Sequence, residues 1–176
     1  MFDPEKCRIT HYPAPVLSQR AVAVEEIDAK IRVLAEKMID IMIETKGVGL
    51  AGPQAGVNLR IFVASVDGSR EKARVYINPE ITPSGSSEAM EEGCLSLPGV
   101  CGKIVRYTKC RIKATGLDGE EFSEDAEGLL ARIFQHEFDH LEGTVIADKL
   151  SSVARIAARK RLKALRERYD SEVGRK

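Results

Sequence analysis

The chain has 176 residues, of which 43% are hydrophobic and 31% are charged, and its 27 basic residues balance its 27 acidic ones. This composition is ordinary for a globular protein and predicts a single domain over residues 1–176 with a sizeable core. The zero net charge disfavours binding of nucleic acid or membrane by the chain as a whole. Because the sequence shows no signal peptide and no apolar run long enough to cross a bilayer, we expect a cytoplasmic protein without a membrane partner.

The first half of the chain predicts an irregular arm, a helix and a series of strands. Pro13 and Pro15 exclude a helix from the arm, residues 7–24. Apolar residues at helical period predict an amphipathic helix over residues 25–45. Alternating apolar residues between turn signals predict the strands. They are expected at residues 60–66, 73–78, 81–87 (as an edge or a turn), 104–117 and, after an Asp118-Gly119 hairpin turn, 121–123.

Two further helices are expected in the last third of the chain. One runs from about residue 125 to 141 and ends at Gly143. After an extended stretch at residues 144–146, a basic C-terminal helix covers residues 151–170. Its apolar stripe consists of Ala154, Ala158, Leu162, Leu165 and Tyr169. The sequence thus predicts an α+β fold with short antiparallel strands packed around a central helix, and with an N-terminal and a C-terminal helix.

A glycine-rich stretch at residues 47–56 matches G-x-G-x-x-G, with Asp67 about twenty residues from its start. A dinucleotide site requires such glycines to follow a strand and open a helix. Here they follow the predicted helix, and Pro53 stands where the next helix would run. We therefore expect no dinucleotide, and we expect the glycines to let the backbone approach a ligand closely.

The central predicted helix carries H-E-x-x-H at His136, Glu137 and His140. Two imidazoles four residues apart lie one turn apart on the same side of a helix and can bind one metal ion. The alternative is a solvated helix face. An adjoining apolar side argues against it and favours a buried helix. That side consists of Leu130, Phe134, Phe138 and Leu141.

A catalytic metal site of this type needs a third protein ligand. Ile146 stands where one extended zinc-peptidase motif has a histidine, and residues 157–161 lack the downstream glutamate of another. The best upstream candidate is Cys94, which lies between a glycine and a Pro-Gly turn. Because the chain has no export signal, its cysteines are expected to be reduced, and a thiolate with two imidazoles suits Zn²⁺ or Fe²⁺.

Three stretches resemble the signature motifs of peptide deformylases of the bacterial type. They are residues 47–54, 92–96 and 135–141, in the order and approximate spacing of that family, and residues 12–17 resemble its N-terminal segment. The resemblance implies removal of the formyl group from N-formylmethionyl nascent peptides, with release of formate. It implies a divalent metal bound by Cys94, His136 and His140, most often Fe²⁺, with Zn²⁺, Ni²⁺ or Co²⁺ as substitutes.

The chemistry implied for this site is hydrolysis of a formamide. The metal lowers the pKa of its bound water towards ~7, and hydroxide attacks the formyl carbon. The resemblance implies that Glu137 is the general acid and base. It also implies that the Gln54 side-chain amide stabilises the oxyanion, together with the Leu95 backbone N–H.

The resemblance also assigns residues to the substrate and to support of the metal ligands. An apolar pocket for the methionine side chain would be lined by Val48, Met90, Leu129 and Ile133. Gly49 and Gly93 would let the substrate backbone pair like an added strand. Glu92 and Arg106 would form a supporting ion pair. The sequence departs from the usual pattern at Ala14, at Gly52, which favours a looser loop, and at Cys101 and Gly102, which leave contacts to later substrate residues open.

Alternatives remain for three features. The residues assigned to the methionine pocket, Val48, Met90, Leu129 and Ile133, fit an ordinary core equally well. The metal motif also fits another metal-dependent amide hydrolase, or a metal-stabilised or RNA-binding module without catalysis. The basic C-terminal helix, residues 151–170, resembles a segment that docks near the ribosomal exit tunnel in bacterial deformylases. It fits equally well a packed helix with a solvated basic face.

Overall fold

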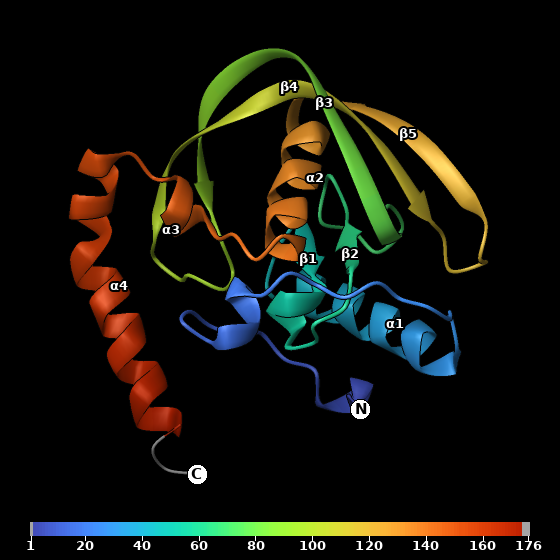
Figure 1. Cartoon of the computed structure of the whole chain (residues 1–176), viewed down its shortest axis with the longest axis horizontal. Coiled ribbons are helices and arrows are strands. Elements are labelled where there is room, and N and C mark those ends of the chain that lie inside the picture. Colours follow the sequence, from blue (N-terminus) through green and yellow to red (C-terminus); the bar gives the residue numbers. More distant parts are fainter. Residues whose placement is uncertain (1, 174–176) are drawn as a thin grey trace.

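A strongly curved, five-stranded antiparallel sheet wraps around one central helix (Figure 1). The structure is a computed structural model, and it describes residues 2–173. Each strand pairs with the next one along the chain, in the order β1-β2-β3-β4-β5. The elements in chain order are η1 (Pro4–Lys6), η2 (Pro15–Ser18), α1 (Ala29–Glu44), β1 (Gly49–Ala51), η3 (Gly52–Ala55), β2 (Ile61–Ala64), β3 (Arg74–Gly93), β4 (Cys101–Thr115), β5 (Glu121–Glu127), α2 (Gly128–Leu141), α3 (Ile146–Lys149) and α4 (Ser152–Val173).

Helices α1 and α2 cover opposite faces of the same short strands. Side chains alternate between the two faces along a strand, so each strand contributes to two clusters. The cluster shared with α1 contains Leu50, Ile61, Val63 and Ile77. The cluster shared with α2 contains Ala51, Phe62, Ala64 and Tyr76. Every residue of β1 and β2 is therefore buried, and α2 packs on one face of these strands.

Helix α4 lies beside the main body of the molecule, with one face turned inward (Figure 1). The predicted apolar stripe of α4 is confirmed, because all its residues belong to a third hydrophobic cluster, in which Leu165 is buried. The stripe consists of Ala154, Ala158, Leu162, Leu165 and Tyr169. The stripe meets Leu97 and Val100 of the β3–β4 connection, together with Ile146 and Leu150. Among residues 2–173, none of the helices combines the length and the apolar character needed to cross a bilayer.

The predicted fold class is confirmed, but β3 and β5 are longer than expected, and β2 is shorter, because it covers Ile61–Ala64 and not residues 60–66. Residues 73–78 and 81–87 were predicted as separate pieces, but all of them except Ala73 belong to the single 20-residue strand β3, and β4 has 15 residues. The ladder with β4 continues through two register shifts and past Asn78, whose φ is 50°. Because its backbone is hydrogen-bonded to β4, β3 remains a strand at positions where the alternation of its side chains is interrupted. The glycine-rich stretch, to which no strand was assigned, forms β1 and η3.

The beginnings of two helices were also predicted too early. Helix α1 begins at Ala29 and not at residue 25, because the Asp28 carboxylate accepts a hydrogen bond from the Ile31 N–H at 2.9 Å and caps the helix. Helix α2 begins at Gly128 and not near residue 125, since residues 125–127 pair with β4 as the end of β5.

At the C-terminal end of the chain, the end of α2 before Gly143, which has a φ of 73°, agrees with the prediction. The stretch at 144–146 is not wholly extended, because Ile146 begins α3. Helix α4 runs three residues further than predicted, to Val173.

Candidate metal centre and active site

Cys94, His136 and His140 come together at the inner side of α2. Their ligand atoms all lie within 4.8 Å of one another, and Cys94 Sγ is 3.3 Å from His140 Nε2. A metal about 2.0–2.3 Å from each ligand requires spacings of this size. A thiolate and two imidazoles are also a donor set that Zn²⁺ and Fe²⁺ accept. The residues present therefore fit a single divalent ion.

Local structure explains why these three side chains meet. His136 and His140 are one turn apart on α2, whose other side packs into the core through Ala131, Phe134 and Leu141. Cys94 is the first residue after β3, and its carbonyl accepts from the Leu97 N–H at 3.0 Å, which closes a turn. The thiol is thus fixed by a strand end and a turn, and both imidazoles by a buried helix.

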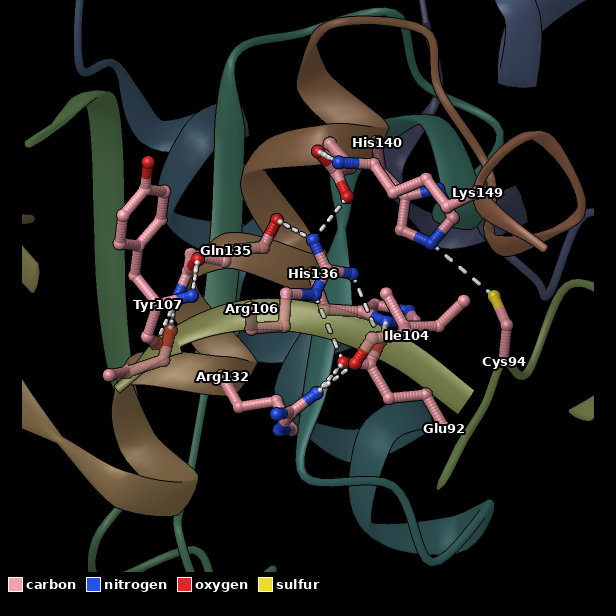
Figure 2. A network of polar contacts seen from close by, with 12 residues as sticks. Glu92, Cys94, Ile104, Arg106, Tyr107, Arg132, Gln135, His136, His140 and Lys149 are labelled. Atoms are coloured by element: carbon pink, nitrogen blue, oxygen red, sulfur yellow. Dashed lines mark hydrogen bonds and ion pairs between the residues drawn. The ribbon is translucent and has the colours of Figure 1, made fainter. Parts of the chain in front are cut away.

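Glu92 holds His136 in place and is itself held by two arginines (Figure 2). Glu92 Oε2 lies 3.0 Å from His136 Nδ1 and accepts from Arg106 Nη2 at 2.9 Å. Glu92 Oε1 accepts from Arg106 Nε at 3.0 Å and from Arg132 Nη1 at 2.7 Å. Burial alone would raise the pKa of Glu92, but the hydrogen bonds from His136 and Arg106 hold it well below its usual range. The carboxylate therefore stays charged and directs His136 Nε2 towards the cluster.

The two histidines are in opposite electrostatic situations. Burial disfavours charge on His136, but its hydrogen bonds with Cys94 and Glu92 outweigh burial and raise its pKa to about 10. Burial, together with the nearby His136 and Arg106, holds the pKa of His140 well below its usual value. A proton on His136 competes for the lone pair that a metal needs, so metal binding has to displace it.

The buried Glu137 side chain points towards the same cluster. It is 4% exposed, and burial raises its pKa to about 7, against the opposing effect of His136 and Arg106. Within the described residues, Glu137 Oε2 has no hydrogen-bond partner, which suits an oxygen that bonds to water or substrate. A Cβ on Gly49 would lie 2.4 Å from Glu137 Oε1, so glycine is required for the carboxylate to stand here.

Gln54 reaches the cluster from η3, and its orientation is set by the backbone. Its Oε1 accepts from the Ala51 N–H at 2.8 Å, which leaves the NH₂ group to face the metal ligands. Gln54 Nε2 donates to Cys94 Sγ at 3.4 Å. The side chain is 1% exposed, so its amide is a fixed donor at the centre of the site.

A cavity of about 520 Å³ connects these groups. It brings together most of the residues that the sequence assigned to the site. The predicted residues lining it are Val48, Gly49, Gln54, Glu92, Gly93, Cys94, Leu95, Leu129, Ile133, His136 and Glu137. Three others lie elsewhere. Arg106 and His140 are buried behind the lining, and Met90 is 45% exposed on β3, outside the lining.

Two polar residues of this site, Arg132 and Asp139, were not predicted from the sequence. Arg132 is 7% exposed, lines the cavity and, besides Glu92, also donates to the carbonyls of Ile104 and Glu88 at 3.0 and 2.9 Å. Asp139 accepts from Arg106 at 2.5 Å and pairs with Lys149 at 2.9 Å. One signal was available: Arg132 precedes His136 by one helical turn, on the side of the helix that the motif marks as buried.

Comparisons with known proteins agree with this geometry. A family model described as polypeptide deformylase matches residues 6–155. Peptide deformylase 1 of Clostridium perfringens is 48% identical over 134 residues, which cover 76% of this chain and 90% of the relative. The peptide deformylase of Acidobacterium capsulatum is 42% identical over 159 residues, covering 89% and 94%.

Solved structures give the same result. A plant peptide deformylase superposes with a TM-score of 0.93 at 35% identity, covering 99% of this chain and 96% of that chain. A peptide deformylase from Plasmodium falciparum gives a TM-score of 0.89 at 37% identity, covering 93% and 98%. The fold, the cluster of Cys94 with two histidines and these relatives together show that the chain belongs to the peptide deformylase family.

Proposed function

We propose that this chain removes the formyl group from N-formylmethionyl peptides and releases formate. The observation that carries the proposal is the juxtaposition, in one cavity, of a Cys-His-His ligand set with the buried Glu137 carboxylate and the oriented Gln54 amide. Each of these groups has a separate part in hydrolysis of a formamide. Membership of an enzyme family whose relatives are named peptide deformylases supports the same conclusion.

Cys94, His136 and His140 would hold one divalent metal. When bound, that ion acts as a Lewis acid on the formyl oxygen and lowers the pKa of water. The Glu92 carboxylate keeps His136 Nδ1 engaged, so that only Nε2 is directed at the ion. The protein thereby fixes the ligand geometry before substrate enters.

Glu137 moves the proton. Its Oε2 accepts a proton from the water that attacks the formyl carbon, and then delivers it to the nitrogen of the departing methionine amine. Enclosure by Gly49 and the neighbouring backbone keeps bulk water from competing for this oxygen. The same carboxylate thus acts first as base and then as acid.

Gln54 and Leu95 would stabilise the negative charge that develops on the formyl oxygen. Because the Gln54 Oε1 is already occupied by the Ala51 N–H, its NH₂ group is the part that is free to donate. Leu95 lines the cavity directly after the Cys94 ligand, where its backbone N–H would be the second donor.

The substrate would lie along the cavity with its methionine side chain in an apolar recess. Val48, Leu129 and Ile133 line the cavity and supply that recess, and Met90 would contribute only from the rim. A Cβ on Gly93 would meet no atom within 4 Å, so the strand end is open to a peptide backbone. Gly49 and Gly93 would thus flank an added strand.

Substrate comparison tests this proposal. Formate release and internal cleavage are measured with a formyl-Met peptide, its acetyl-Met counterpart and an unmodified longer peptide. We expect turnover of the formyl peptide alone, as the proposed deformylase function requires. Equal or faster cleavage of the internal bond would instead identify a metallopeptidase.

We further propose Fe²⁺ as the ion of the native protein. The resemblance to peptide deformylases supports this choice, and the thiolate with two imidazoles accepts Fe²⁺ as well as Zn²⁺. Metal analysis after anaerobic purification, paired with activity before and after exposure to air, tests this. We expect iron and a loss of activity in air. A zinc-loaded protein that is equally active in air would contradict the assignment.

The basic outer face of α4 is proposed as a contact to the ribosome. The apolar stripe is turned inward. The exposed surface of α4 carries the basic side chains of Arg159 and Lys163, which no other part of the described chain engages apart from a pair of Lys163 with Glu167 on the same helix. Arg155 and Arg166 lie beside them but bond to Ala147, Asp148 and Tyr12. Salt-dependent cosedimentation with ribosomes tests it. A double Arg159→Glu and Lys163→Glu variant should lose cosedimentation, and unchanged cosedimentation would refute the contact.

A further inference from the structure

The connection between β3 and β4 forms one wall of the active-site cavity. It begins with Cys94 and Leu95, and its last residues, Gly99 and Val100, also line the cavity together with Cys101, the first residue of β4. Cys101 is the ladder partner of Gly93, the open strand end beside which a peptide backbone would lie. This part of the wall is therefore placed beside substrate residues that follow the first one.

Helix α4 packs against this wall. Leu97 and Val100 are 0% and 2% exposed. Both are buried in the cluster that Leu165 of α4 joins, and Ala158 and Leu162 pack against that cluster. Helix α4 therefore contributes to the burial of both loop residues, together with the N-terminal arm and α3.

Two glycines, Gly99 and Gly102, are in close contact with neighbouring side chains on either side of the wall. A Cβ on Gly99, whose φ is 77°, would lie 2.7 Å from Arg161 Nε, and Arg161 Nε donates to the Pro98 carbonyl at 2.8 Å. A Cβ on Gly102 would lie 2.4 Å from Leu150 Cδ2 and 3.7 Å from Ala154 Cβ. The Arg161 guanidinium thus contacts the loop backbone directly, and Leu150 and the start of α4 pack on the beginning of strand β4.

We propose that α4, through Arg161, is a positioning element for the part of the cavity that binds substrate residues beyond methionine. The C-terminal helix then has an internal role in addition to any external partner. This inference rests on the proposed deformylase function. Arg161 is a positioning residue and not a catalytic one, because it contacts the wall and contacts neither the metal ligands nor Glu137 or Gln54.

The test compares Arg161→Ala with Arg159→Ala, a change of the same size and charge on the same helix. Among the residues that the structure describes, Arg159 makes no hydrogen bond to the wall. Each protein is assayed with formyl-Met-Ala and with a formyl-Met tetrapeptide. We expect Arg161→Ala to raise KM for the tetrapeptide by about 3- to 10-fold, the range that one hydrogen bond supplies. KM for the short substrate and kcat for both should change by less than about 2-fold, and Arg161→Lys should restore part of the loss.

Hydrogen exchange provides a readout that does not depend on turnover. The Val100 N–H donates to the Leu97 carbonyl at 3.0 Å, and it should exchange faster in Arg161→Ala than in Arg159→Ala. Equal KM values for both substrates in the two variants, with equal exchange at Val100, would overturn the positioning role. Absence of formate release from either substrate by the unmodified protein would instead overturn the proposed function, while exchange at Val100 would still decide the role of Arg161.

Discussion

Arg132 supports Glu92, which in turn holds His136, and the sequence did not predict this role. Replacing Arg132 with methionine removes that support. The side chain keeps its length along the cavity wall but loses three hydrogen bonds, to Glu92 Oε1 and to the carbonyls of Ile104 and Glu88. Each bond that involves a charged group contributes about 1.5–3 kcal/mol, and breaking a buried ion pair costs about 3–5 kcal/mol. Because Arg106 still holds Glu92, we expect the lower value, about 3 kcal/mol.

That loss is large enough to be measured by thermal unfolding. In a chain of this size, 1 kcal/mol shifts Tm by roughly 2–4 °C, so Arg132→Met should lower Tm by about 6–12 °C. The matched control is Arg111→Met, which breaks an equally close but exposed pair with Asp125 at 2.7 Å. Exposed pairs contribute at most about 1 kcal/mol, so its Tm should fall by no more than about 2–4 °C. Similar shifts in the two variants would show that the buried network around Glu92 does not stabilise the site.

Three further outcomes follow from the site geometry. Gln54→Leu removes the oriented amide donor and should lower kcat by about 10²–10³ with metal content unchanged, and near-normal kcat would exclude the oxyanion role. Gly49→Ala places a methyl group 2.4 Å from Glu137 Oε1 and should lower kcat about 10²-fold by displacing the carboxylate, whereas full activity would show that it is free to move. Burial raises the pKa of Cys110 to about 11, so its thiol stays neutral at pH 8 and should resist iodoacetamide until the pH approaches 11. The exposed Cys101 should react first, and mass mapping that finds Cys110 modified at the same rate would contradict this.

Local sequence patterns were sufficient to predict the centre of the site. Helical spacing placed His136 and His140 on one side of α2, and exclusion of downstream ligands led to Cys94, which the structure brings to the same cluster. These inferences depend on neighbours along the chain or on residue chemistry. The central helix, the antiparallel sheet and the apolar stripe of α4 were predictable for the same reason.

Features that depend on pairing between distant segments were not predictable. The length of β3 follows from its ladder with β4, which continues where Pro83 and Gly85 interrupt the side-chain pattern. The start of α2 at Gly128 follows from pairing of residues 125–127 with β4. Arg132 joins Glu92 from 40 residues away along the chain. Sequence periodicity carries no information about such contacts.

Formate release measured with matched metal content is the most direct test of the function proposed here. The unmodified protein and Glu137→Gln are loaded with the same divalent ion, and each is assayed with a formyl-Met peptide. The proposal predicts rapid release by the unmodified protein and a decrease of about 10²–10⁴ in kcat for the variant, with metal still bound. Equal rates for the two proteins, or no formate from either, would contradict it.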